Sequence, residues 1–171
     1  AGSQDGTSSA MFYLLVYCIM NVGAFGAIIL ARTDDGDTVE IADYAGLGFR
    51  NPVLAIFMSV MMFSLAGFPP TAGFVSKFYV FRSAVESGRT WLVIIAAINT
   101  AVSAYYYLRV VVTLYMKERR VELKVLPYSG HLVIALIIAT AGVLLVGVLP
   151  SQILNPVQEA IKSSVMLSAM K

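Results

Sequence analysis

The amino-acid sequence predicts an all-α membrane protein with four transmembrane helices, and two features of its composition support that prediction. Of the 171 residues, 58% are hydrophobic and only 13% are charged. Soluble domains carry about 25% charged residues, so this chain has too few charges to cover its surface in water. A bilayer span needs about 20 mostly apolar residues. Four such segments are predicted, at about residues 9–31, 52–85, 90–116 and 131–149.

These four segments place the transmembrane region in residues 1–150 and leave residues 151–171 as a C-terminal tail. Apolar residues of the tail recur at Leu154, Val157, Ile161 and Val165, close to one face of a helix. We therefore expect an amphipathic helix there.

The charges of the loops predict the orientation in the membrane. Residues 117–130 contain Lys117, Arg119, Arg120 and Lys124, and an excess of Lys and Arg marks cytoplasmic loops. Alternation of the segments then places residues 32–51 in the cytoplasm as well and the C-terminal tail on the periplasmic side. Tyr105, Tyr106 and Tyr107 lie about 21–24 Å along a helix from Trp91 and are expected to form an aromatic belt at the membrane interface.

The second segment contains a predicted helix break between Gly67 and Gly73. Pro69 and Pro70 lack a backbone donor and clash with a continuing helix. Backbone groups freed in this way cannot face lipid, so they must lie against protein or water. Unwound segments of this kind occur at the ion sites of transporters.

Lys77 follows the break by one turn, within otherwise apolar sequence. An ammonium group at the bilayer centre costs about 2.5–3.5 kcal/mol or more, so it needs polar surroundings. One interpretation is a functional group that faces a polar interior and exchanges a proton. The other is a structural lysine that reaches the membrane interface. The apolar residues 78–81 that follow favour the first interpretation only slightly.

Other polar side chains of the predicted segments are candidates for a channel lining. Tyr13, Tyr17 and Asn21 recur every four residues and so share one helical face. Such side chains could order water or simply form hydrogen bonds between helices. The candidates are Tyr13, Tyr17 and Asn21 in the first segment, Ser64, Thr71 and Ser76 in the second, and Asn99, Thr100 and Ser103 in the third.

Composition also limits the chemistry of the chain. The single cysteine, Cys18, and the single histidine, His131, cannot hold an iron–sulfur cluster, and no metal site is expected. A net charge of +2 without a basic, aromatic-rich run does not indicate nucleic-acid binding.

The residues around the break resemble the antiporter-like membrane subunits of respiratory complex I. The resemblance rests on residues 64–81 and 104–110, and it extends to residues 17–26 and 43–48. Within that family the chain is most similar to the C-terminal part of the subunit N group of bacterial NADH-quinone oxidoreductase, related to mitochondrial subunit 2.

The resemblance implies that the four segments are helices 11–14 of a fourteen-helix fold. It also implies that Lys77 is the proton-transfer residue of the second half-channel, on a broken helix 12. In sister subunits the helix 11 positions of Tyr13, Tyr17 and Asn21 tend to carry His and Lys, so these positions have lost their titratable groups here. The expected setting is the bacterial inner membrane.

The implied partners are lipid and other membrane subunits, namely a neighbouring antiporter-like subunit and small helical subunits. NADH, FMN, iron–sulfur clusters and quinone would belong to the whole complex and none to this chain. Two alternatives stay open. One is a subunit of a multisubunit cation/proton antiporter or a membrane-bound hydrogenase, and the other is a purely structural membrane segment.

Overall fold

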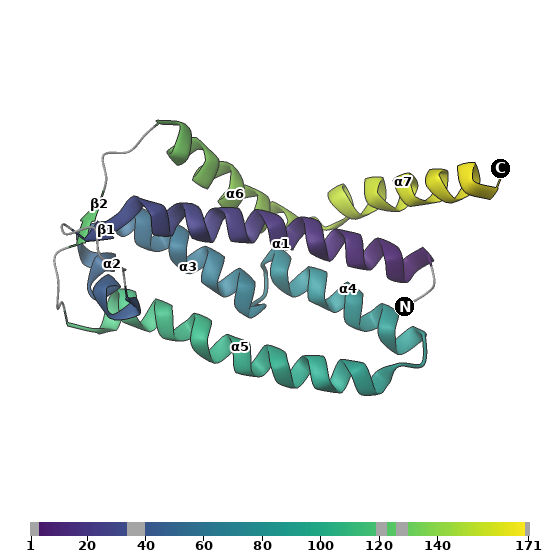
Figure 1. Ribbon diagram of the computed structural model, residues 1–171, viewed down its shortest axis with the longest axis horizontal. Helices are drawn as coiled ribbons and strands as arrows, with labels where there is room; N and C mark the ends of the chain where they lie inside the picture. Colours follow the sequence, from purple (N-terminus) through teal and green to yellow (C-terminus); the bar gives the residue numbers. More distant parts are fainter. Residues whose placement is uncertain (1–3, 34–39, 119–122, 126–129, 170–171) are drawn as a thin grey trace.

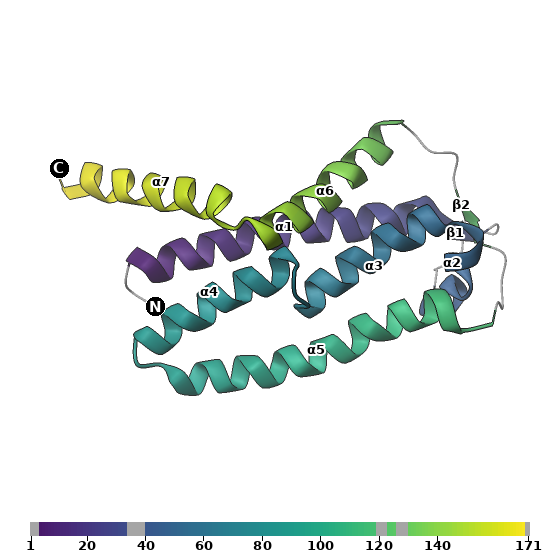
Figure 2. The ribbon, with the colours of Figure 1, turned by 180° about the vertical axis from the view of Figure 1, so that it is seen from behind.

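The computed structural model describes residues 4–33, 40–118, 123–125 and 130–169. Its long helices lie roughly along one axis (Figures 1 and 2). They are α1 (Gln4–Leu30), α3 (Pro52–Ala66), α4 (Ala72–Glu86), α5 (Thr90–Met116), α6 (Gly130–Val148) and α7 (Ser151–Ala169). A short 3-10 helix (Ile41–Tyr44) and α2 (Leu47–Arg50) precede α3.

Three helices in the described part of the chain are long and apolar enough to cross a membrane. These are Gly6–Leu30, Thr90–Met116 and Gly130–Val148, while Pro52–Ala66 is apolar but shorter. The segment predicted at residues 52–85 contains two helices, α3 and α4, of 15 residues each. Both views show them following one another along the side of α1.

A small antiparallel strand pairing lies beyond the ends of α1 and α5, where the sequence predicts loops. β1 (Ala31–Thr33) pairs with β2 (Leu123–Val125), and Ala31 lies opposite Val125. Strands of three residues that are far apart in sequence carry no periodic signal, which explains why they were not predicted.

The buried core lies between α1, α3 and α6. Phe12, Val16 and Met20 of α1 contribute to one cluster with Met61 of α3 and Val143 of α6. A second cluster lies nearer the β1–β2 pairing and is formed around Leu30, Tyr44, Leu54, Leu114 and Leu136. These two clusters hold α1 against the region where α3 and α4 meet.

The outer helix α5 is covered less than α1 and α6, the other two helices that are long and apolar enough to cross a membrane. Among its described residues only Thr113 and Leu114 are buried. Ile94, Ile98 and Val102 are exposed over more than half of their surface. In the membrane, this apolar side of α5 needs lipid or further protein to cover it.

Candidate functional site

The site is built at the junction of α3 and α4, which we define as residues 67–71. Gly67 ends α3 with φ +90°, in the left-handed region that glycine adopts without strain. The N–H of Gly67 donates to the Ser64 carbonyl oxygen at 3.0 Å, and the N–H of Phe68 donates to that of Phe63 at 3.0 Å. This pattern is a Schellman motif, which terminates the helix and satisfies two of its last carbonyl groups.

Lys77 of α4 binds the next two carbonyl groups of α3. Its Nζ donates to the Leu65 carbonyl oxygen at 2.9 Å and contacts that of Ala66 at 3.4 Å. The end of a helix carries a partial negative charge because its last carbonyl groups point outward. The junction therefore supplies backbone acceptors to a half-buried ammonium group, which offsets part of the cost of burying it.

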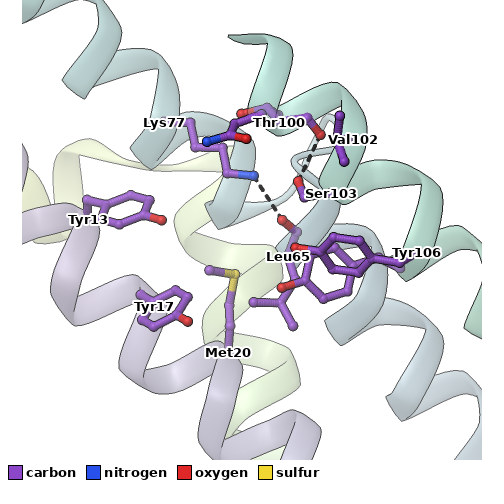
Figure 3. Close-up of a pocket in the computed structure, with 11 residues that line it drawn as sticks. Tyr13, Tyr17, Met20, Leu65, Lys77, Thr100, Val102, Ser103 and Tyr106 are labelled. Carbon is purple, nitrogen blue, oxygen red and sulfur yellow. Dashed lines mark hydrogen bonds between the residues drawn. The ribbon is translucent and has the colours of Figure 1, made fainter. Parts of the chain in front are cut away.

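A polar cavity of about 380 Å³ opens in front of the Lys77 ammonium group (Figure 3). α1, α3, α4 and α5 all contribute to its walls. The cavity is large enough to hold several water molecules. Its lining residues are Tyr13, Tyr17, Met20, Leu65, Lys77, Asn99, Thr100, Val102, Ser103, Tyr106 and Tyr107.

The structure brings five of the residues singled out in the sequence to the same cavity as Lys77. These are Tyr13, Tyr17, Asn99, Thr100 and Ser103. The rings of Tyr13 and Tyr17 stack with their centroids 5.9 Å apart. Hydroxyl and amide groups from two helices therefore face the same space as the ammonium group.

Asn21, which shares the sequence stripe of Tyr13 and Tyr17, does not line this cavity. Its side-chain amide donates to the Tyr17 carbonyl oxygen at 2.8 Å, within α1 itself. The stripe follows a spacing of four residues, slightly more than one helical turn, so each step rotates the side chain away from the cavity.

Ser64, Thr71 and Ser76 do not line the cavity either, because all three are buried in the packing of the junction. The Ser64 hydroxyl donates to the Met20 sulfur at 2.8 Å and accepts from the Gly73 N–H at 3.1 Å. The Thr71 and Ser76 hydroxyls donate to the Phe68 and Gly73 carbonyl oxygens. Their polar groups hold the backbone at the junction in place.

Two tyrosines that line the cavity were not among the candidates predicted from the sequence. Tyr106 and Tyr107 line the cavity, with their ring centroids 4.6 Å apart, whereas an interfacial belt was expected for Tyr105 to Tyr107. Tyr105, 72% exposed, lies outside the cavity lining. The spacing of Asn99, Ser103, Tyr106 and Tyr107 at three or four residues is the signal that could have found this shared face.

Two glycines allow the close approach of backbones at the junction. A Cβ atom on Gly73 would collide with the Ser64 carbonyl group, so α4 is seated directly on the end of α3. A Cβ atom on Gly147 of α6 would collide with the Pro70 carbonyl oxygen and with Thr71. The junction is thus enclosed by backbone from two sides.

Together these features define a helical membrane protein in which a lysine binds the end of a neighbouring helix and faces a polar cavity. Residues 1–103 match the family described as "NADH:quinone oxidoreductase/Mrp antiporter, TM". Since the match covers more than half of the chain, the chain belongs to this family.

Two curated relatives that are similar in sequence are both named as subunit N of NADH-quinone oxidoreductase. The chain is 46% identical over 162 residues to NADH-quinone oxidoreductase subunit N of Trichlorobacter lovleyi, covering 95% of this chain and 33% of the relative. It is 48% identical over 149 residues to subunit N 1 of Thermodesulfovibrio yellowstonii, covering 87% and 31%. The chain therefore spans about a third of the length of these relatives.

The fold has a solved counterpart. A chain of the structure titled respiratory complex I from Thermus thermophilus with bound aureothin superposes with a TM-score of 0.76 at 30% sequence identity. The match covers 86% of this chain and 34% of that chain. The resemblance to complex I membrane subunits inferred from the residues is confirmed by these similarities.

Proposed function

We propose that this chain forms the second proton-transfer half-channel of a subunit N-type membrane subunit of NADH-quinone oxidoreductase, with Lys77 as the proton-exchanging group. The observation that supports it most is the position of the Lys77 ammonium group between the end of α3 and a polar cavity. The relatives named subunit N support the assignment to this complex.

The same proposal treats α3 and α4 as the two halves of one broken transmembrane helix. Each helix has 15 residues and extends about 22 Å at 1.5 Å per residue, less than the ~30 Å of a hydrocarbon core. Neither half spans the membrane alone, whereas the two in sequence do. With α1, α5 and α6 they would form helices 11–14 of the fourteen-helix fold.

In this account the cavity supplies the proton path on one side of Lys77. Hydroxyl groups both donate and accept hydrogen bonds, so Tyr17, Ser103 and Tyr106 can orient water in either direction of transfer. The Leu65 carbonyl oxygen holds the Lys77 ammonium group at the edge of the cavity, where water in the cavity would accept its proton. Release of a proton from Nζ then leaves a neutral amine, which needs no counter-charge until it is protonated again.

The proposed setting follows from the same assignment. The subunit would lie in the bacterial inner membrane, with residues 32–51 and 117–130 in the cytoplasm and the C-terminal tail in the periplasm. Its partners would be lipid, a neighbouring antiporter-like subunit and small helical subunits. NADH, FMN, iron–sulfur clusters and quinone would act in the complex outside this chain.

Proton uptake by inverted membrane vesicles tests the role of Lys77. Lys77→Met, introduced into the native membrane complex, should lower NADH-driven proton uptake at least about tenfold, since positioned proton-transfer groups contribute about 10²–10⁴-fold. Lys117→Met is the matched control, because Lys117 is exposed at the C-terminal end of α5. Full uptake by Lys77→Met in a normally assembled complex would overturn the proposal.

A second candidate is a subunit of a multisubunit cation/proton antiporter or of a membrane-bound hydrogenase, because the matched family also covers Mrp antiporters. Purification of the tagged protein in mild detergent separates the two. Co-purification with NADH-oxidising activity supports the first candidate. Sodium-dependent proton exchange without such activity supports the second.

A further inference from the structure

Ser64 lies at the point where three helices meet, and it does not line the proposed proton path. It belongs to the last turn of α3 and is fully buried, with 0% of its surface exposed. Its hydroxyl accepts a hydrogen bond from the Gly73 N–H of α4 and donates one to the Met20 sulfur of α1. One hydroxyl group therefore connects α1, α3 and α4.

The bond to Gly73 fixes the first turn of α4. The first four N–H groups of a helix lack partners within that helix, and Gly73 is the second residue of α4. The Ser64 hydroxyl satisfies this N–H at 3.1 Å. The absence of a side chain on Gly73 lets the two backbones meet directly, so a small displacement of the hydroxyl would shift the start of α4.

The start of α4 in turn sets the position of Lys77. Gly73 and Lys77 are four residues apart and lie on the same side of α4. On the other side of the junction, Ser64 directly precedes Leu65, whose carbonyl oxygen accepts the hydrogen bond from Lys77 Nζ at 2.9 Å. The Ser64 hydroxyl thus links α4, which contains Lys77, to the end of α3, whose Leu65 carbonyl oxygen accepts the hydrogen bond from Lys77.

We propose that Ser64 is a positioning residue for Lys77: its hydroxyl seats α4 on α3 so that the ammonium group meets the Leu65 carbonyl group and faces the cavity. This inference rests on the proposed function of Lys77. Ser64 itself does not line the cavity, so it acts through the backbone and transfers no proton. The Met20 sulfur accepts the hydrogen bond from Ser64 and thereby connects the contact between α3 and α4 to α1. Met20 also lines the cavity.

A matched serine of the same helix distinguishes positioning from ordinary packing. Ser59 is also buried in α3, 7% exposed; its hydroxyl donates to the Ala55 carbonyl oxygen at 2.7 Å within the same helix and lies 3.4 Å from the Tyr115 hydroxyl of α5. It lies more than one turn before the junction. Ser59→Ala removes a buried hydroxyl without touching the start of α4.

The experiment measures NADH-driven proton uptake by inverted vesicles that carry the native complex with Ser64→Ala, Ser64→Thr or Ser64→Val. Thr and Val have almost the same shape, so they differ only in the hydroxyl group. Ser64→Ala and Ser64→Val should lower the uptake per assembled complex about 2- to 10-fold, the range expected for loss of the hydrogen bond to the Gly73 N–H. Ser64→Thr should recover most of the wild-type rate, and Ser59→Ala should equal it.

The branched side chains could prevent assembly in this tight site, and the comparison of Ser64→Ala with Ser59→Ala then decides. The inference is overturned if Ser64→Ala pumps like wild type, if Ser59→Ala loses as much uptake as Ser64→Ala, or if assembled Ser64→Thr and Ser64→Val complexes lose equal uptake. Lys77→Met in the same series keeps the two proposals apart. Loss in Lys77→Met with normal Ser64→Ala rejects only the positioning role, whereas normal pumping by Lys77→Met rejects the proton-transfer role itself.

Discussion

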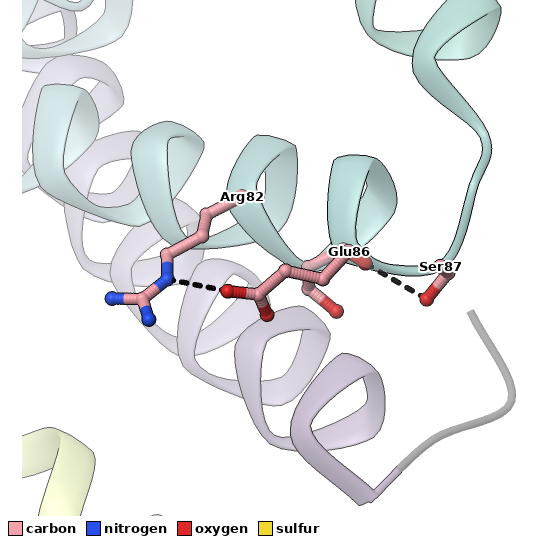
Figure 4. A network of polar contacts seen from close by, with 4 residues as sticks. Arg82, Glu86 and Ser87 are labelled. Carbon is pink, nitrogen blue, oxygen red and sulfur yellow. Dashed lines mark hydrogen bonds and ion pairs between the residues drawn. The ribbon is translucent and has the colours of Figure 1, made fainter.

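Lys77 and Arg82 are cationic side chains of the same helix, α4, and they meet different surroundings. Lys77 is half-buried and donates to backbone carbonyl groups at the end of α3. Arg82 donates from Nε to a carboxylate oxygen of Glu86 at 2.8 Å, and the two side chains are 62% and 55% exposed (Figure 4). Lys77 is therefore bound to the last carbonyl groups of another helix, whereas Arg82 pairs with a residue on the exposed side of its own helix.

The difference shows that the surroundings of a charged side chain on α4 depend on the backbone next to it. An exposed ion pair four residues apart on a helix contributes about 0.3–0.5 kcal/mol, so Arg82 and Glu86 need no functional explanation. Lys77 lies one turn after the junction, where α3 ends and its carbonyl groups become available. A substitution that disrupts the junction should therefore lower assembly and proton uptake far more than one that removes the ion pair.

The largest effect is expected from Gly73→Ala, which changes the contact between the first turn of α4 and the end of α3. The new methyl group would collide with the Ser64 carbonyl group, and overpacking of a tight site costs about 1–3 kcal/mol or more. We expect loss of most of the assembled complex or of its proton uptake. Blue native gels and vesicle assays measure the two quantities.

Gly142→Ala in α6 is the control for that variant. A Cβ atom on Gly142 would meet only the Ile19 side chain, at 4.0 Å, which is ordinary contact. Alanine is favoured over glycine inside a helix, so this variant should assemble normally. Equal loss in both variants would mean that the junction is no more sensitive than the rest of the bundle.

An intermediate effect is expected from Tyr17→Phe, which removes one hydroxyl from the cavity and keeps the ring stacked on Tyr13. If this hydroxyl orients water next to Lys77, proton uptake should fall about threefold, as for one lost hydrogen bond. Tyr105→Phe serves as the comparison, because Tyr105 is exposed and does not line the cavity. An unchanged rate in Tyr17→Phe would remove this hydroxyl from the proposed path.

The smallest effect is expected on the other side of the comparison, in Arg82→Met. Loss of the exposed ion pair with Glu86 should change stability by about 0.5 kcal/mol or less and leave proton uptake within about twofold of wild type. Thermal denaturation of the purified complex and the vesicle assay check both numbers. If Arg82→Met lost as much proton uptake as Lys77→Met, the different surroundings of the two cations would not explain a difference in function.

The sequence was informative where single residues dictate the backbone. Pro69 and Pro70 exclude a regular helix, and α3 and α4 meet on either side of them. Lys77 was identified because its charge is costly in an apolar segment. Tyr13, Tyr17, Asn99 and Ser103 were chosen for their polarity, and they lie around the same cavity.

The hydrogen-bond partners of these residues depend on how α4 packs on the end of α3, which no local pattern encodes. The carbonyl groups of Leu65 and Ala66 accept from Lys77 only because a Schellman motif uses the two carbonyl groups before them. Ser64 and Ser76 looked like channel residues, yet the packing of α4 on α3 buries them among backbone groups. Tyr106 and Tyr107 were not predicted to line the cavity, because interfacial tyrosines and cavity tyrosines have the same sequence signature.

The central claim is that Lys77 exchanges a proton, and Lys77→Arg tests it most directly. Arginine keeps the positive charge and can still donate to the carbonyl groups of α3, but it does not release its proton in proteins. Arg82→Lys in the same complex is the reciprocal control. The account predicts an assembled complex whose NADH-driven proton uptake falls at least about tenfold for Lys77→Arg, as for loss of a proton-transfer group, and stays unchanged for Arg82→Lys. Wild-type proton uptake by Lys77→Arg would contradict it, because a fixed charge would then be sufficient.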